Sequence, residues 1–332
     1  MRKILIYIFG FVLLCFLIPI IFTKRPEKAV VKINEASKES DNNQNENKTD
    51  TKTPTIVKLL HAETGEVEEL EMDKYLYGVV SAEMPANFEK EALKAQAIVA
   101  RTYTEYKIYK GSKHENADIC DDSKCCQAWI SKEKRFEKWN EVDRENNWNK
   151  IISAVDETSG KIITYDGAPI NAFFHSNSGG TTETVANVWG GSNYPYLQSV
   201  ETSGEDGYTQ YASTVTLTKE EVLQKMQAEY PETTIDWTQE MPIQITEYNE
   251  SGRVKTIQIG NKSISGVEAR TIFGLKSAKF NVQVGESVQF DVVGYGHGVG
   301  LSQTGADAMA KTGATAEQII NHYYTGVKIE NI

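Results

Sequence analysis

The chain has 332 residues and a formal net charge of −11 at pH 7. This charge argues against a nucleic-acid partner, because binding to a phosphate backbone relies on clustered cations. The composition changes twice along the chain, from an apolar start to a polar segment and then to a globular mixture.

The apolar start, residues 1–26, reads MRKILIYIFGFVLLCFLIPIIFTKRP and is predicted to be a membrane anchor. The uncharged run from Ile4 to Phe22 has about the length that a membrane-spanning helix needs. A cleaved signal peptide is the less favoured alternative, because the run ends without a small-x-small cleavage site. With Arg2 and Lys3 on the cytoplasmic side, we expect a single-pass protein of the cell membrane with an extracytoplasmic ectodomain.

The polar segment, residues 27–55, is predicted to be a disordered tether to the ectodomain. It contains no aromatic residue, so it cannot bury enough apolar surface to offset the entropy of ordering its backbone. All five tryptophans fall in residues 56–332. That length suits either one large core or two lobes.

Hydrophobic patterns in residues 56–332 predict hairpins and helices. Alternating runs flank four short turns, which predicts β-hairpins at Thr64-Gly65, Asp166-Gly167, Ser251-Gly252 and Gly285-Glu286. Helical spacing or capping residues predict several helices. Two of them begin with a capping residue, Asp73 before 74–84 and Asn87 at the start of 87–109. The others are 133–160, a helix that starts at Thr218, 265–275 with a Ser265–Glu268 capping box, and 315–326. Because hairpins and helices do not alternate strictly, the predicted fold is α+β with mainly antiparallel sheet.

The segment SAEMP places Glu83 at the end of a predicted helix, after an apolar turn. A carboxyl group in apolar surroundings has a raised pKa and can stay protonated near neutral pH, as a general acid requires. The alternative is a surface glutamate at a helix end, which its position alone favours.

The next predicted helix carries polar side chains although its sequence, KAQAIVARTY, indicates burial on nearly every face. If Arg101 is internal, it needs an anionic partner, because an unpaired buried charge is costly. The alternative is ordinary exposure, in which long side chains lie along apolar surface. The polar residues in question are Lys94, Gln96, Arg101 and Tyr103.

Two glycine-containing segments suggest a ligand site. AFFHSNSGG sets Ser176 directly after a predicted strand, where a rigid scaffold would hold it, although a plain loop is an equal alternative. GYGHGVGLSQTG alternates glycine with other residues, which allows close approach to a ligand or to another strand. This second segment lacks the nucleotide-binding fingerprints and contains His297, Ser302 and Gln303.

The stretch HENADICDDSKCC holds three of the four cysteines. His114, Cys120 and Cys126 are spaced six and six residues apart, and a histidine with two thiolates suits zinc. We favour zinc over a disulfide or free thiols, because an odd cysteine would be left over from any bridge. Candidates for the fourth position are Asp118, Asp121, Cys125, water or substrate.

Taken in this order, the segments SAEMP and ALKAQAIVARTY, FFHSNSGG, GYGHGVGLSQTGADAMAKTG and IINHYYTG resemble the SpoIID/LytB family over nearly all of residues 56–332. The resemblance implies a peptidoglycan lytic transglycosylase. Such an enzyme cleaves the β-1,4 bond between N-acetylmuramic acid and N-acetylglucosamine and leaves a 1,6-anhydro-muramyl end. The implied substrate is glycan stripped of stem peptides, in septal remodelling and engulfment during sporulation. The implied partners are a cell-wall amidase and a membrane scaffold of the engulfment machinery.

The resemblance also implies roles for individual residues. The acid of the family falls on Glu83, and clostridial members carry a zinc site that falls on His114, Cys120 and Cys126, where the metal is expected to be structural. Substrate-binding positions fall on Lys94, Gln96, Arg101, Tyr103, Ser176, His297, Ser302 and Gln303. The alternative function is a non-catalytic module that binds glycan or activates an amidase. A zinc hydrolase is disfavoured, because the chain contains no H-E-x-x-H motif.

Overall fold

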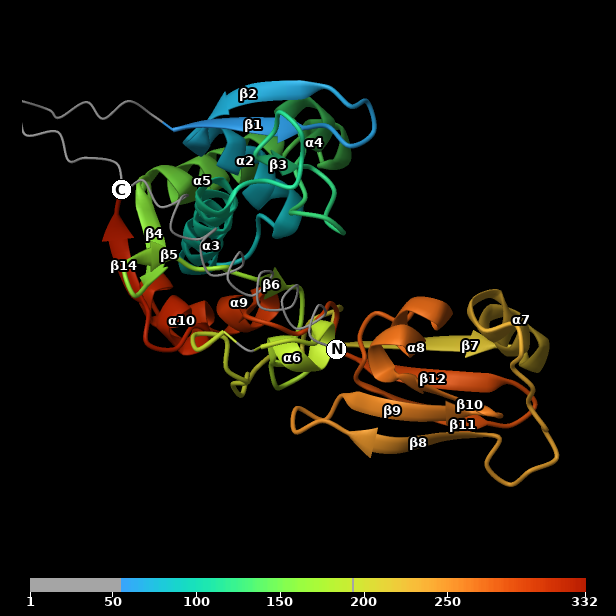
Figure 1. Ribbon diagram of the computed structural model, residues 1–332. Helices are drawn as coiled ribbons and strands as arrows, with labels where there is room; N and C mark the ends of the chain where they lie inside the picture. Colours follow the sequence, from blue (N-terminus) through green and yellow to red (C-terminus); the bar gives the residue numbers. More distant parts are fainter. Residues whose placement is uncertain (1–54, 193) are drawn as a thin grey trace, which may run out of the picture. The chain divides into compact units, whose positions relative to one another are not determined.

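The computed structural model describes residues 55–192 and 194–332, which fold into helices and several antiparallel sheets (Figure 1). The α+β prediction is therefore confirmed. The predicted anchor, residues 1–26, and the predicted tether up to residue 54 lie outside the described ranges. Within those ranges, no helix is both long enough and apolar enough to cross a membrane.

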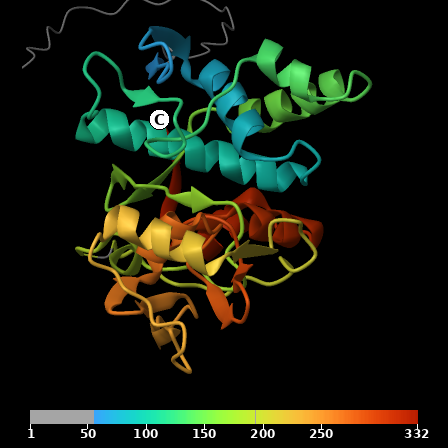
Figure 2. The same ribbon diagram turned by 90° about the vertical axis from the view of Figure 1, so that its right-hand side faces the viewer.

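A long internal helix, α3 (Lys90–Lys110), organises the first hydrophobic core. Most of its middle is buried, because the small residues of AQAIVA let neighbouring elements approach closely. Figure 2 shows this teal helix along its length. The elements that pack on it include α2 (Met72–Glu83), α5 (Arg144–Asp156), α9 (Gln303–Lys311), α10 (Ala316–Tyr323) and β4 (Lys161–Tyr165).

Short strands frame the first core, and two of the predicted hairpins are among them. The turn at Asp166-Gly167 connects β4 to its antiparallel neighbour, with positive φ angles of 50° and 76° that suit a tight hairpin turn. In one sheet, β1 (Ile56–Leu60) pairs with β2 (Val67–Glu71) and β3 (Ile119–Cys120). In another sheet, β5 (Ala168–Pro169) and β14 (Lys328–Asn331) flank β4.

A short parallel pair brings two distant motifs together. β6 (Phe174–His175) pairs with β13 (Leu301–Ser302). Parallel strands end at the same edge, so Ser176 and Gln303, which follow them, emerge beside one another. The helix α9 starts there, and its N-cap Ser302 accepts a hydrogen bond from the Gly305 amide at 3.4 Å.

Residues 212–293, here called the excursion, contain a second hydrophobic core. Two antiparallel sheets of three strands, in the orders β11-β12-β7 and β10-β9-β8, build it together with two helices. The predicted turns at Ser251-Gly252 and Gly285-Glu286 and the Ser265–Glu268 capping box are present. The bounds are β7 (Ala212–Leu217), α7 (Lys219–Glu229), β8 (Ile243–Tyr248), β9 (Val254–Ile259), β10 (Lys262–Ser265), α8 (Gly266–Phe273), β11 (Phe280–Val284) and β12 (Val288–Val293).

The excursion leaves the first core and returns to it at one point. Its first strand, β7, pairs with its last strand, β12, so that Ala212 lies opposite Val293. Directly beyond this pair, the Gly294 amide donates a hydrogen bond to the Tyr211 carbonyl at 2.7 Å. The first core is therefore built from the chain on both sides of the excursion.

Three helix predictions were wrong in detail. A single helix over 133–160 does not form, because the backbone is extended at Trp139 (ψ 149°), which separates α4 (Lys132–Lys138) from α5. Neither Asp73 nor Asn87 caps a helix, since α2 begins at Met72 and α3 at Lys90. The Asp73 carboxylate instead accepts a hydrogen bond from Arg101 at 2.7 Å.

Candidate active site and metal cluster

A pocket of about 360 Å³ opens at the C-terminal end of α2, where Glu83 is the last helical residue. The helix stops there because Met84 is extended and Pro85, which follows, disfavours a helical conformation at the residue before it. Side chains from α4, from the end of β6 and from the start of α9 complete the walls. Among the lining residues are Glu83, Arg135, Trp139, Ser176, Gln303 and Thr304.

Glu83 has the properties that a general acid needs. Its Oε1 accepts a hydrogen bond from the Ala128 amide at 2.6 Å, and the Gln303 side chain also hydrogen-bonds to it. Loss of water around the carboxyl group raises its pKa from 4.5 to about 7, against the opposing effect of these two hydrogen bonds. A pKa this close to neutrality means that both the protonated and the ionised form of Glu83 are present near pH 7.

The segment that carries Ala128 is fixed against α2 and α3. Gln127 is buried, and its Nε2 donates to the Tyr75 hydroxyl at 2.9 Å and to Thr104 Oγ1 at 3.0 Å. On the other side of Ala128, the Trp129 indole lies against Gly78 so closely that a Cβ at that glycine would be 2.2 Å from Trp129 Nε1. The hydrogen bond to Glu83 therefore comes from a rigid support.

The opposite wall consists of the two motifs that β6 and β13 bring together. The Thr304 amide donates to the Ser176 carbonyl at 3.0 Å. Behind the wall, Gln303 Nε2 donates to the buried Gln96 Oε1 at 3.4 Å. Of the predicted site residues, Glu83, Ser176 and Gln303 therefore line the pocket, and Gln96 supports Gln303 from behind.

A buried carboxylate that the sequence analysis missed, Glu205, connects the two motifs. It accepts hydrogen bonds from the Ser178 and Gly180 amides at 3.0 and 3.1 Å and from Thr304 Oγ1 at 2.9 Å. The hydroxyls of Ser178 and Ser302 also donate to it. Ser302 is therefore not one of the residues that line the pocket, and it supports the pocket wall through its hydrogen bond to Glu205. Its surroundings, SGEDG, look like an exposed turn and gave no signal of burial.

Three other predicted residues have partners away from the pocket lining. Lys94 Nζ lies 2.8 Å from a Glu91 carboxylate oxygen. Arg101 is buried and donates to Asp73 and, at 2.7 Å, to the Thr158 carbonyl, so its expected anionic partner is present. The buried Tyr103 packs in the first core.

His297 also lies outside the pocket lining, in an aromatic cluster with His175 and Trp189 at ring distances of 5.6 and 5.0 Å. Burial lowers the pKa of both histidines, that of His175 to about 3, so both are neutral at pH 7. The alternating glycines here allow close packing of protein groups. A Cβ at Gly300 would lie 2.0 Å from the Phe173 carbonyl oxygen.

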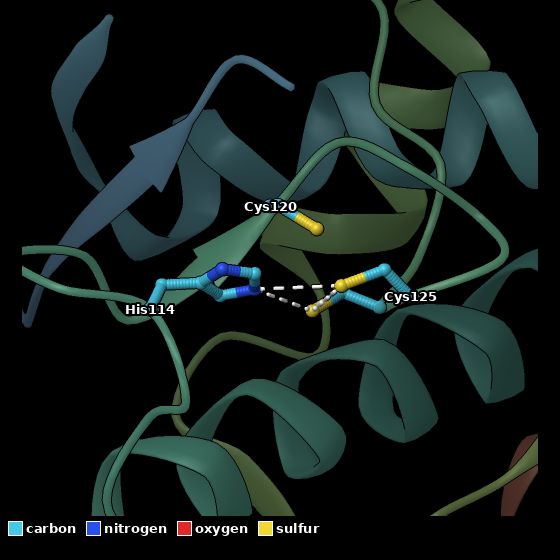
Figure 3. A group of neighbouring side chains, drawn as sticks. His114, Cys120 and Cys125 are labelled. Atoms are coloured by element: carbon cyan, nitrogen blue, oxygen red, sulfur yellow. Dashed lines mark hydrogen bonds between the residues drawn. The ribbon is translucent and has the colours of Figure 1, made fainter. Parts of the chain in front are cut away.

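The second candidate site is the histidine and cysteine cluster (Figure 3). Ligand atoms of His114, Cys120, Cys125 and Cys126 all lie within 4.8 Å of one another, and the three described cysteines form no disulfide. His114 Nε2 lies 3.5 Å from each of the Cys125 and Cys126 sulfurs, which are 3.7 Å apart. Tetrahedral zinc with bonds of about 2.0 Å to nitrogen and 2.3 Å to sulfur spaces its ligand atoms about 3.5 to 3.8 Å apart. The ligand atoms of His114, Cys125 and Cys126 therefore have the spacing that such a metal needs, and Cys120 lies within 4.8 Å of them.

Comparison with known proteins gives consistent matches. The family model SpoIID, described as stage II sporulation protein, matches residues 61–165. "Stage II sporulation protein D" of Bacillus subtilis is 35% identical over 280 residues, which cover 83% of this chain and 79% of that protein. The protein of the same name from Bacillus amyloliquefaciens matches equally well. The "Amidase enhancer" of Bacillus subtilis is 27% identical over 306 residues, 76% of this chain and 40% of that protein.

Proposed function

The chain belongs to the SpoIID family of stage II sporulation proteins, and from this premise we propose that it is a peptidoglycan lytic transglycosylase. The observation that carries the proposal is Glu83, a desolvated carboxyl group with a pKa of about 7 in the wall of a pocket. Among the described residues that line this pocket, it is the only carboxylic acid. A hydrolase of the usual kind would need a second carboxylate to activate water or to act as nucleophile.

In the proposed reaction, one carboxyl group serves twice. Protonated Glu83 donates its proton to the glycosidic oxygen while the bond from that oxygen to the muramyl C1 breaks. The resulting carboxylate then accepts the proton of the muramyl C6 hydroxyl while O6 bonds to C1 and closes the 1,6-anhydro ring. Glu83 ends protonated and no water is consumed. An internal nucleophile suits this scheme, because its effective concentration is high.

The substrate that we propose is the β-1,4 bond between N-acetylmuramic acid and N-acetylglucosamine in strands without stem peptides. The setting would be septal remodelling and engulfment in sporulation, at the cell membrane, with an amidase and a membrane scaffold as partners. The names of the Bacillus relatives, "Stage II sporulation protein D", support the sporulation part of this proposal. Ser176 and Gln303 would contact the glycan, since they line the pocket with Glu83.

We further propose that His114, Cys120, Cys125 and Cys126 hold zinc in a structural role. Bound there, zinc would cross-link the loop after α3 to the segment that leads to Ala128. The cluster supplies four protein ligands, and closed four-ligand sites are typical of structural rather than catalytic zinc.

The reaction is tested with the purified full-length chain and peptide-free glycan strands. We expect products with anhydro ends, which are one water lighter than hydrated reducing ends by mass spectrometry. Glu83→Gln keeps the shape of the side chain and an acceptor for the Ala128 amide but cannot transfer the proton. We expect cleavage to fall at least about a hundredfold.

Glu137→Gln is the matched control, because Glu137 is an exposed residue of α4, and it should cleave as the wild type does. Hydrated ends would show a hydrolase instead of a transglycosylase. Cleavage by Glu83→Gln above about a tenth of the wild-type rate would remove Glu83 from the role of acid.

The second candidate function, a non-catalytic activator of an amidase, is favoured by one observation, the similarity to the amidase enhancer. The two functions differ in the activity that is expected of the purified chain without a partner protein. An activator would leave peptide-free glycan intact and would only accelerate an added amidase, whereas the proposed enzyme cleaves the glycan with no partner present.

A further inference from the structure

Arg135 is a cation in the wall of the proposed catalytic pocket, and it has no carboxylate partner. It lies on α4 and, with Glu83, is one of the two ionisable side chains among the described residues that line the pocket. No acidic side chain in the described part of the chain forms an ion pair with it. Since Glu83 is neutral when it is ready to act as an acid, the pocket then carries the positive charge of Arg135.

Protein contacts hold the guanidinium group of Arg135 in place but use only part of its hydrogen-bonding capacity. One nitrogen, Nη2, donates to the Ser81 carbonyl near the end of α2. The guanidinium carbon lies over the Trp139 ring, 4.9 Å from the ring centroid, in a cation–π contact. A second nitrogen, Nε, is buried without any acceptor among the described residues, as are the Nε atoms of Arg101 and Arg253. An arginine presents five N–H donors in a planar fork, and the two on Nη1 form no hydrogen bond within the described chain, so this end of the fork remains for a ligand.

Two fully buried arginines, in contrast to the half-buried Arg135, show what a structural role looks like in this fold. Arg101 donates to the Asp73 carboxylate and to backbone carbonyls. Arg253 donates to two backbone carbonyls, and nearby Glu183 and Glu205 stabilise its charge. Burial lowers the pKa of Arg135 as well, yet no acid offsets that cost. Such a cost is typical of a binding position, where the ligand supplies the missing anion.

We propose that Arg135 is a specificity-determining residue that binds a carboxylate on the glycan substrate. The inference rests on the proposed function. In a muramyl residue that carboxylate is the lactyl group, which is a free anion only where no stem peptide is attached, because the peptide occupies it as an amide. An arginine fork pairs with a carboxylate through two parallel hydrogen bonds, and an amide cannot accept both. Arg135 would thus distinguish glycan strands without stem peptides from strands that carry them.

Binding separates this role from the chemistry. The probes are peptide-free glycan strands with free lactyl carboxylates and the same strands after conversion of those groups to methylamides. Calorimetric titration of the full-length Glu83→Gln chain avoids turnover. We expect the free-acid strands to bind about tenfold to a hundredfold more tightly than the methylamide strands, as a charge-assisted fork implies.

Substitutions at Arg135, made in the same Glu83→Gln chain, then show which residue supplies the preference. Arg135→Gln should bind both strands equally, at the level of the methylamide strand. Arg135→Lys keeps the charge without the fork and should retain part of the preference. Lys138→Gln removes one positive charge from an exposed position on the same helix and should keep all of it. Thermal melting checks that each variant is folded.

Two results would overturn the inference. One is equal binding of the two strands by the Glu83→Gln chain with Arg135 in place. The other is a loss in Arg135→Gln that is equal for both strands, which would mean that Arg135 only ties α4 to Ser81. The proposed function fails separately, if the wild type cleaves neither strand while the preference in binding persists.

Discussion

Glu83 lies where stability and chemistry make opposite demands. Water around a carboxylate stabilises its charge, and the pocket removes most of that water. Because the pKa in the folded chain, about 7, is above the ordinary value of 4.5, ionisation of Glu83 opposes folding. The free energy of unfolding therefore contains no penalty from this residue below pH 4.5, and the penalty grows as the pH rises toward 7.

We expect Glu83→Gln to be more stable than the wild type at pH 8, by up to about 3 kcal/mol, because glutamine stays neutral. At pH 4 the two chains should unfold at nearly the same urea concentration. Urea denaturation of both chains at the two pH values measures this difference. Equal free energies of unfolding at pH 8 would mean that the folded chain solvates the Glu83 carboxylate as well as water does.

At the scale of elements, the segment from Cys126 to Trp129 joins the two candidate sites. Cys126 belongs to the histidine and cysteine cluster, and the Ala128 amide, two residues later, donates a hydrogen bond to Glu83. Between them Gln127 is hydrogen-bonded to residues of α2 and α3. A metal on the cluster would therefore stiffen the support of the acid from about two residues away, without taking part in proton transfer.

Metal analysis should find about one zinc per chain, and we expect Cys120→Ser to lose it. The Ala128 amide should then exchange with deuterium faster, because the segment behind Glu83 is no longer fixed at one end. Ser123→Ala, a change at an exposed residue of the same loop, should keep both the zinc and the slow exchange. A native Cys120–Cys125 or Cys120–Cys126 disulfide, or unchanged exchange in metal-free Cys120→Ser, would contradict this view.

Local sequence patterns predicted the helices and strands well. They could not predict contacts between residues that are far apart in the chain. Hairpins such as the one at Asp166-Gly167 and the capping box at Ser265 follow from residues a few positions apart. Glu83 was predicted through the family resemblance, because its position alone favoured a surface glutamate. Nothing local reveals Glu205, whose partner Ser302 lies 97 residues away. Arg135 was missed for the same reason, since the pocket that it lines comes from segments far apart in the chain.

At the scale of the whole described chain, the excursion reaches back into the first core through polar contacts. Arg253, just before β9, donates to the Thr181 and Ser178 carbonyls, each at 2.8 Å. Lys279 Nζ donates to the Gly179 carbonyl at 2.8 Å. These contacts hold the loop that follows Ser176, so the second core helps to shape a wall of the pocket.

We expect Arg253→Met to lower the free energy of unfolding by about 2 to 4 kcal/mol, because two buried carbonyls lose their donor and nearby Glu183 loses a compensating charge. Urea denaturation measures the change. Lys255→Met is the matched control. This substitution removes the positive charge of Lys255, a residue of β9 with a side chain that is 53% exposed. It should lower the free energy of unfolding by at most about 1 kcal/mol. A similar small effect for Arg253→Met would show that the two cores are independent in stability.

The single point at which the excursion departs and returns has a mechanical consequence. The first core holds the chain on both sides of the excursion together, with α9 and α10 packed on α3. A load between the start of the described chain and the pocket would therefore pass through the first core, and not through the Tyr211–Gly294 hydrogen bond or the β7–β12 ladder. A chain held at one end while its pocket grips an insoluble polymer would thus leave the excursion without load, and its contacts with the loop after Ser176 would persist.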